Sequence, residues 1–127
     1  MADMEVELVA PDRIVWSGEA EFVLARTSEG DIGILPNHEP MLGVLVEHPV
    51  KVKRSGEDEL VVAVLGGFLS VTRDRVSILA ESVEMPDEID ASAARSEYEE
   101  ARSGDDDEDK AKARRAAARL RAVGETV

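Results

Sequence analysis

The chain has 127 residues, which is enough for one ordinary domain with an appendage and excludes two large domains. It carries 28 acidic and 15 basic residues, for a formal net charge of -13 at pH 7. Such a fold repels phosphate backbones and anionic lipid surfaces, so the composition argues against a nucleic-acid partner. Without cysteine there is neither a disulfide framework nor a thiolate metal site, which fits a reducing compartment such as the cytoplasm.

No segment of the sequence indicates insertion into a lipid bilayer. The acidic stretch at residues 1–11 lacks the basic and apolar regions of a signal peptide. The longest largely apolar stretch, Leu60 to Val71, is far shorter than the roughly 20 residues that cross a bilayer. We therefore expect no direct lipid insertion, and another protein would have to hold the chain at any membrane.

From Met4 to about Pro86, short runs alternate between apolar and polar residues. Val6 and Leu8 share one face, and the same period recurs in VKVK at 50–53 and in RVSILA at 75–80. Turn signals separate the runs at intervals of roughly ten residues or more, which is typical of an antiparallel sandwich or barrel. The alternation places Trp16 and Ile14 on one strand face, and we expect that face in the core.

The stretch LVVAVLGGFLSV, Leu60 to Val71, is too continuously apolar for half-exposed strands. Its Gly66-Gly67 pair predicts a bend or bulge between two central strands, at a point where another backbone passes closely. We expect this stretch to form the centre of the sandwich.

After Pro86 the period changes to that of a helix. Asp90 is a candidate N-cap, apolar residues follow at spacings of three and four, and Ser103-Gly104 ends the helix. A second helix begins in the acidic run 105–109 and ends among arginines, which complements the helix dipole. The sequence thus predicts an α+β fold by segregation: an N-terminal antiparallel β-sandwich, residues 1–86, followed by a C-terminal α-helical hairpin, residues 87–127.

The apolar face of the second helix consists mostly of alanine, which offers little area to bury. Helices this short are marginal alone, so we expect the hairpin to dock weakly on the sandwich and to be able to leave it. The basic residues from Lys110 to Arg121 form a solvated helix face in one interpretation and a surface that seeks an acidic partner in the other.

The thirteen residues GDIGILPNHEPML, 30–42, predict a stiff and exposed loop. Gly30 and Gly33 suit the positive φ of turns, and Pro36 and Pro40 fix φ. A restricted loop loses less entropy when it binds, so this segment is a candidate docking surface.

An enzymatic interpretation would begin with His38 and Glu39 in this segment. No nucleophile motif, phosphate-binding loop or metal-ligand spacing accompanies them, and His48 stands alone before Pro49. A turn histidine that bonds its own loop is the simpler interpretation, so we predict no active site. A small hydrolase using His38 and Glu39 is the lowest-ranked alternative.

Three segments, SEGDIGILPNHEPML (28–42), VAVLGGFLSV (62–71) and RVSILAESV (75–83), closely resemble the epsilon subunit of bacterial F-type ATP synthases. An opening strand with APDRIVWSGEA and the closing hairpin follow in the same order, so the resemblance covers essentially the whole chain. It implies a non-catalytic subunit of the central stalk, turning with the rotor of a proton-translocating complex that makes ATP from ADP and phosphate. Its place would be peripheral, at the cytoplasmic face of the cell membrane.

The resemblance also implies partners. In that family the sandwich binds the gamma subunit and rests its end loops on the polar loops of the c-ring. The matching loop assigns c-ring contact to six residues: Glu29, Gly30, Asp31, His38, Pro40 and Met41. The start of the chain and the region after the loop assign gamma contact to Pro11, Asp12, Gly43 and Val44.

In the same family the helical tail folds on the sandwich or extends along gamma toward the catalytic beta or alpha subunits, where it inhibits ATP hydrolysis. The basic groups that would meet acidic residues there are Arg114, Arg115, Arg119 and Arg121.

Some relatives bind ATP through an Ile/Leu-Asp-x-x-Arg-Ala motif at the first helix. The matching stretch here is IDASAA, with Ala93 in place of the arginine. Arg95 lies about 200° around the helix from Ala93 and points elsewhere. We therefore expect no cofactor and weak or absent ATP binding, and a free-standing nucleotide sensor is the second-ranked alternative.

Overall fold

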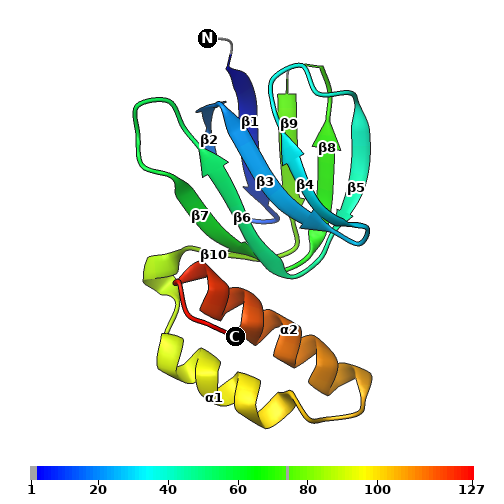
Figure 1. Ribbon diagram of the computed structural model, residues 1–127, viewed down its shortest axis with the longest axis vertical. Coiled ribbons are helices and arrows are strands. Elements are labelled where there is room, and N and C mark those ends of the chain that lie inside the picture. Colours follow the sequence, from blue (N-terminus) through cyan, green and yellow to red (C-terminus); the bar gives the residue numbers. More distant parts are fainter. Residues whose placement is uncertain (1–2, 74) are drawn as a thin grey trace.

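The computed structural model describes residues 3–73 and 75–127, which form ten strands followed by two helices (Figure 1). The strands are β1 (Met4–Ala10), β2 (Arg13–Ala20), β3 (Phe22–Thr27), β4 (Gly30–Ile34), β5 (Met41–Leu45), β6 (His48–Lys53), β7 (Leu60–Val64), β8 (Gly67–Val71), β9 (Arg75–Ala80) and β10 (Val83–Glu84). A short 3-10 helix, Pro86–Glu88, leads to α1 (Ala91–Ala101) and α2 (Asp107–Ala122).

The strands form one hydrogen-bonded path, β10-β7-β6-β3-β5-β8-β9-β1-β2, with β4 paired to β3. β3 and β5 share a single residue pair, Thr27 opposite Leu45, and the path folds there into two layers. One layer holds β10, β7, β6, β3 and β4, and the other holds β5, β8, β9, β1 and β2. The predicted sandwich followed by a helical hairpin is confirmed.

The core lies between the layers and follows the predicted alternation. The inward residues of β1, β6 and β9 are buried, namely Val6, Leu8, Val50, Val52, Val76, Ile78 and Ala80. One pairing departs from the antiparallel prediction, because β1 and β9 run parallel with Val6 opposite Val76. Pairing between two strands so far apart in the chain leaves no mark on the period of either.

The prediction that Ile14 shares a buried face with Trp16 is wrong. Trp16 lies opposite Leu8 and packs against the core, whereas Ile14 lies opposite Val9 and is 68% exposed. A bulge between these pairs inserts one extra residue into β2 and reverses the face on which the residues before it lie.

The Gly66-Gly67 pair joins β7 to β8 with φ values of 90° and 133°, which favour glycine. A side chain on Gly67 would overlap the carbonyl oxygen of Leu79 in β9. The predicted close backbone approach is confirmed at this turn.

The predicted loop of residues 30–42 is largely strand, because β4 ends at Ile34 and β5 begins at Met41. Gly30 has the expected positive φ, 118°, but Gly33 does not. A Cβ at Gly33 would lie 2.9 Å from the ring of Phe22, so close packing requires glycine there.

The connecting loop contains a tight turn. The amide of His38 donates to the carbonyl of Leu35 at 3.2 Å, and Asn37, which follows Pro36, has a φ of 68°. These are features of a type II turn, so the loop is stiff as predicted, although only six residues long.

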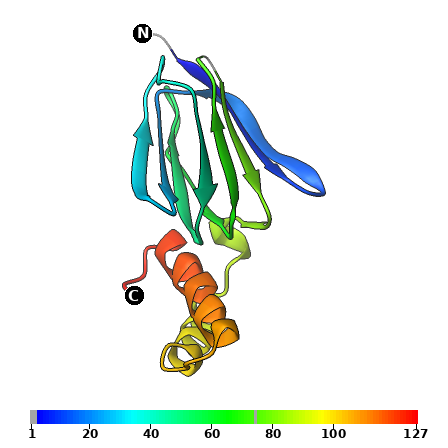
Figure 2. The same ribbon diagram turned by 90° about the vertical axis from the view of Figure 1, so that its right-hand side faces the viewer.

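The helical hairpin lies beyond one end of the sandwich, and the N-terminal end of β1 lies at the other (Figure 2). The Asp90 carboxylate accepts a hydrogen bond from the amide of Ala93 at 3.0 Å, so the predicted N-cap of α1 is confirmed. Asp106 caps α2 in the same way through the amide of Asp109 at 2.8 Å. α2 is the helix that packs against the sandwich, on β6 and β7.

Candidate functional site

A row of apolar side chains crosses the outer face of the second layer. Val44 of β5 lies opposite Phe68 of β8, which lies opposite Leu79 of β9. Leu79 lies opposite Val9 of β1, and Val9 lies opposite Ile14 of β2. Directly paired residues point to the same side of a sheet, so these five form one row about 19 Å long.

The row is open to solvent. Phe68 is 50% exposed, Leu79 45% and Val44 51%, while Leu42, two residues before Val44 and on the same side, is 73% exposed. We call this set, with Ile14 and Val9, the outer apolar face.

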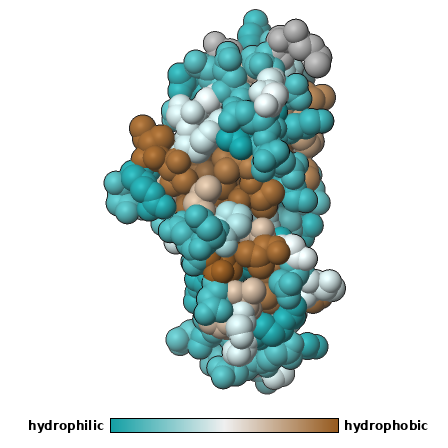
Figure 3. All heavy atoms as spheres, turned by 90° about the vertical axis from the view of Figure 1, so that its left-hand side faces the viewer, coloured by the Kyte–Doolittle hydropathy of each residue, from teal (hydrophilic) through white to brown (hydrophobic). Residues whose placement is uncertain are grey.

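The other layer meets the hairpin at one end of the sandwich, where α2 packs on β6 and β7 (Figure 2). Beyond the outer apolar face, hydrophobic side chains also gather on the side of the molecule seen in Figure 3, midway between two mainly hydrophilic ends. The continuous apolar run at Leu60–Val71 therefore has two explanations: its first half, β7, is buried or partly buried, and its second half, β8, presents Phe68 outward. The expectation that the whole run would be central to the sandwich was wrong for the outer side of β8.

The residues predicted to contact gamma fall around this face. Pro11 and Asp12 form the exposed β1–β2 turn, next to Ile14 at one end of the row. Val44 is the other end, whereas Gly43 faces inward, where an added Cβ would meet the side chain of Thr27 at 3.2 Å. The sequence did not predict that Phe68, Leu79 and Leu42 lie on the surface. The only signal was that β5, β8 and β9 have apolar residues at both odd and even positions, and therefore on both faces of the sheet.

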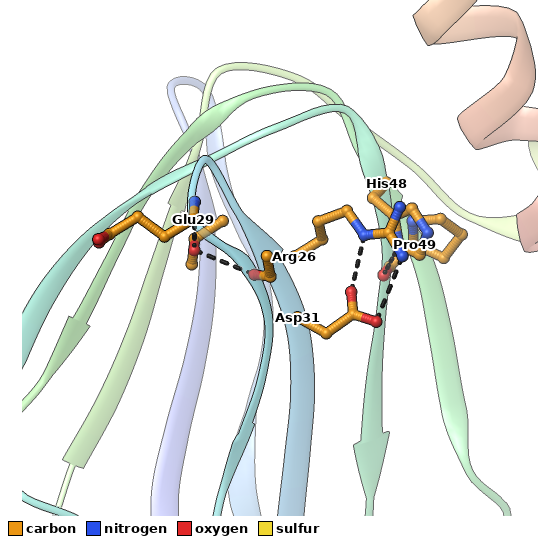
Figure 4. A network of polar contacts seen from close by, with 7 residues as sticks. Arg26, Glu29, Asp31, His48 and Pro49 are labelled. Carbon is orange, nitrogen blue, oxygen red and sulfur yellow. Dashed lines mark hydrogen bonds and ion pairs between the residues drawn. The ribbon is translucent and has the colours of Figure 1, made fainter.

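The six residues predicted to contact the c-ring do not lie together. Glu29 in the β3–β4 turn and Gly30 and Asp31 at the start of β4 lie at the end of the sandwich that faces the helices (Figures 1 and 4). His38 and Pro40 lie in the β4–β5 loop at the opposite end, where His38 lines a small hollow with Met4 and Val71. Met41 follows them as the first residue of β5 and packs partly against the core.

The β3–β4 turn is held in place by hydrogen bonds. The Thr27 hydroxyl donates to the carbonyl of Gly30 at 3.0 Å and accepts from the amide of Glu29 at 3.1 Å. Asp31 receives two hydrogen bonds from Arg26, at 2.7 and 3.2 Å. The Arg26 guanidinium lowers the pKa of Asp31, which therefore stays ionised, and the Glu29 side chain projects away from this pair (Figure 4).

The β4–β5 loop is also fixed from within. The carbonyl of Glu39 accepts a hydrogen bond from Nδ1 of His38 at 2.7 Å. This is the loop-bonded histidine that the sequence indicated. Among residues 3–73 and 75–127, no group of three metal-ligating side chains converges.

The hairpin is docked by small apolar residues and by two ion pairs. Ala116, Ala117 and Leu120 of α2 are buried. Arg119 binds Glu84 of β10 through three contacts of 2.9 to 3.0 Å and reaches Glu97 of α1 at 3.5 Å. Hydrogen bonding to Glu84 raises the pKa of Arg119, which remains cationic throughout the physiological range.

A second pair joins Arg114 to Glu47 at 3.2 Å, just before β6. Arg121 lies on the rim of a cleft of about 370 Å³ between sandwich and helices, and Arg115 is partly buried in α2. Arg95 of α1 was predicted to point in a different direction from position 93. Its side chain donates to the carbonyl of Thr126 and so ties this segment to α1.

These features define a binding module: a stiff sandwich with a bare apolar face and an attached hairpin held by small apolar residues and two ion pairs. In the part of the chain that the structure describes, no helix is long and apolar enough to cross a membrane.

Comparison with known proteins identifies the family. Residues 3–86 match the model of the ATP synthase Delta/Epsilon chain, beta-sandwich domain. The chain is 55% identical over 125 residues to an ATP synthase epsilon chain of Mycobacterium avium, covering 98% of both chains. It is 52% identical over 122 residues to that of Streptomyces griseus, covering 96% of both. The chain therefore belongs to the ATP synthase epsilon chain family.

Solved structures share the fold. A chain in the mitochondrial ATP synthase of Euglena gracilis, in a structure of OSCP, F1 and c-ring, is 24% identical with a TM-score of 0.76, covering 94% of this chain and 76% of that one. A chain of the central stalk and c-ring of Tetrahymena thermophila ATP synthase is 19% identical with a TM-score of 0.67, covering 94% of this chain and 96% of that one.

The ion pair between Arg119 and Glu84 gives a direct test of docking. We expect Glu84→Gln to weaken docking by about 1 kcal/mol, because the charge is lost while the shape is kept. Hydrogen exchange of the α2 amides should then become about fivefold faster. The control is Glu99→Gln, because the Glu99 carboxylate pairs at 3.5 Å with Arg102, the C-cap of the same helix, and its loss should leave exchange unchanged. Equal rates in Glu84→Gln and the parent chain would show that this pair does not hold the hairpin.

Proposed function

We propose that this chain is a non-catalytic subunit of the central stalk of an F-type ATP synthase, and that it couples the c-ring to the gamma subunit. It works at the cytoplasmic face of the membrane as a peripheral component of a proton-translocating complex. The outer apolar face is the single observation that carries the proposal, because a free-standing domain has no reason to leave such a row uncovered.

The outer apolar face is proposed as the surface that binds gamma. Phe68 lies inside the row rather than at either end, and aromatic residues away from the edge of an interface contribute most to binding. Leu79 and Val44 flank Phe68, and covering half of each side chain is worth about 1 kcal/mol. Pro11 and Asp12 at one end supply a polar rim, as interfaces usually have.

Replacing Phe68 with serine should weaken gamma binding by about tenfold to a hundredfold, with little change in stability because the ring is half-exposed. Binding is measured by titrating the purified chain with purified gamma. The matched control is Leu35→Ser, since Leu35 is 59% exposed but lies in the β4–β5 loop, away from the face. If both variants bind as the parent chain does, gamma binds elsewhere.

Contact with the c-ring is proposed at one end of the sandwich. Either end suits the role, because both turns are stiff and polar and so transmit torque with little bending. The six assigned residues cannot all meet one flat ring, since β4 separates Glu29 and Asp31 from His38 and Pro40.

Cysteine cross-linking decides between the ends. In the assembled complex we expect a cysteine at Glu29 or at His38 to cross-link to the polar loops of the ring, but not both. The chain has no natural cysteine, so each variant reports one position. Cross-links from both positions, or from neither, would contradict contact through a single end.

The hairpin is proposed as a regulatory tail that inhibits ATP hydrolysis when it extends toward beta or alpha. In the docked state Arg119 and Arg114 already bind carboxylates of the sandwich, Glu84 and Glu47. Extension would exchange these partners for acidic groups on the catalytic subunits, with Arg115 and Arg121 adding charge. A mostly alanine face makes that exchange inexpensive, as a two-state element requires.

Deleting residues 87–127 tests this role. We expect ATP hydrolysis by the reassembled complex to rise severalfold, while gamma and the ring still bind the sandwich. Unchanged hydrolysis in a complex that retains the shortened chain would remove the inhibitory assignment.

We propose no ATP site and no cofactor. Ala93 is exposed and cannot bind phosphate, and the Arg95 side chain is directed to the end of the chain. Isothermal titration of the full chain with ATP should give no binding at micromolar concentration. Micromolar affinity would favour the nucleotide-sensor alternative, and turnover by the isolated chain would favour the hydrolase.

A further inference from the structure

His48 lies at the junction between the sandwich and the hairpin. It is the first residue of β6, is half-buried, and lines the cleft of about 370 Å³ beneath the helices. Its Nδ1 donates to the carbonyl of Pro49 at 3.1 Å (Figure 4). The chain has only one other histidine, His38, which lies in the β4–β5 loop.

Four arginines line this cleft together with His48. The sandwich contributes Arg26, the C-cap of α1 contributes Arg102, which lies over the Tyr98 ring, and α2 contributes Arg114 and Arg121.

The acids nearby are already engaged. Asp31 binds Arg26, and Glu47 binds Arg114. A charged imidazole would therefore enter a cleft lined by four guanidinium groups, while the two carboxylates named above are already paired with arginines.

The environment lowers the pKa of His48 below its ordinary value. Burial is the largest cause, and Arg26 and Arg121 lower it further, while the bond to Pro49 and the charge of Asp31 act in the opposite direction. Arg121 belongs to α2, and the helices provide part of the burial. When the hairpin leaves, both effects are lost, and the pKa returns toward about 6.5.

This difference in pKa determines how docking of the hairpin depends on pH. His48 binds protons more weakly when the hairpin is docked than when it has left. Well above pH 6.5, from about pH 7.5 upward, the imidazole is almost entirely neutral in both states and docking is unaffected. As pH falls below that value toward the lower docked pKa, the undocked state takes up the proton first and gains population.

We propose that His48 makes docking of the hairpin sensitive to acid, so that a charged imidazole among the arginines of the cleft favours release of the helices. The consequence for the enzyme, more extended tail and stronger inhibition of hydrolysis at acidic pH, rests on the proposed regulatory role. The docking equilibrium itself does not.

The test uses the isolated full chain with one dye at Lys53→Cys on the sandwich and another at Lys112→Cys on α2. Both lysines are exposed, and the absence of natural cysteine makes labelling specific. Energy transfer then reports the ratio of undocked to docked hairpin. Between pH 7.5 and 5.5 we expect this ratio to rise by about threefold.

His48→Gln should keep the docked ratio of pH 7.5 across the whole range, and His38→Gln should respond as the parent chain does. An NMR titration of the parent chain supplies a second readout, in which the His48 ring should titrate at lower pH than histidine in a peptide. The proposal is overturned if the parent ratio does not change with pH, if His48→Gln responds as strongly as the parent, or if the His48 ring titrates as in a peptide. None of these results depends on hydrolysis, so the truncation experiment tests the inhibitory role separately.

Discussion

The fold depends on how one continuous path of strands closes into two layers at a single backbone pair, Thr27 opposite Leu45. Thr27 is the one buried polar side chain in the described core. Its hydroxyl holds the β3–β4 turn by donating to the carbonyl of Gly30 and accepting from the amide of Glu29. Because the path closes at this pair, β4 and β5 lie in different layers. The β3–β4 turn and the β4–β5 loop lie at opposite ends of the sandwich. The same closure leaves each layer with an outer face that something else must cover or leave bare.

The free chain covers one end of the sandwich and leaves one outer face open. α2 packs at the end of the sandwich on β6 and β7, through alanines and Leu120, with Arg119 and Glu84 adding an ion pair (Figure 2). The outer apolar face with Phe68 and Leu79 remains open. This asymmetry links structure to the proposed role: a permanent partner takes the bare face, while the covered end belongs to a hairpin that can leave.

The sequence predicts elements whose signals are local. Alternation located the inward residues of β1, β6 and β9, and Asp90 marked the start of α1. It does not predict contacts that depend on distant strands, such as the parallel pairing of β1 with β9. A single inserted residue in β2 turned the Ile14 side chain to the outer face. Glycine is needed at position 33 because the Phe22 ring packs against it, and not because a turn requires positive φ there.

The candidate site was predictable only in part for the same reason. Proline and glycine marked stiff turns, but the six residues assigned to the ring were placed in one loop, because nothing local shows that residues 30–34 form a strand. The docked partners of Arg114 and Arg119 are carboxylates far away in sequence, so only the folded chain reveals them. The most direct measurement of the central claim is maleimide labelling of Leu79→Cys, compared with Glu57→Cys in the β6–β7 turn, in the free chain and in assembled ATP synthase. The account predicts that the cysteine at position 79 reacts in the free chain and is protected in the complex, while the cysteine at position 57 reacts in both; equal reactivity at position 79 in the two states would contradict it.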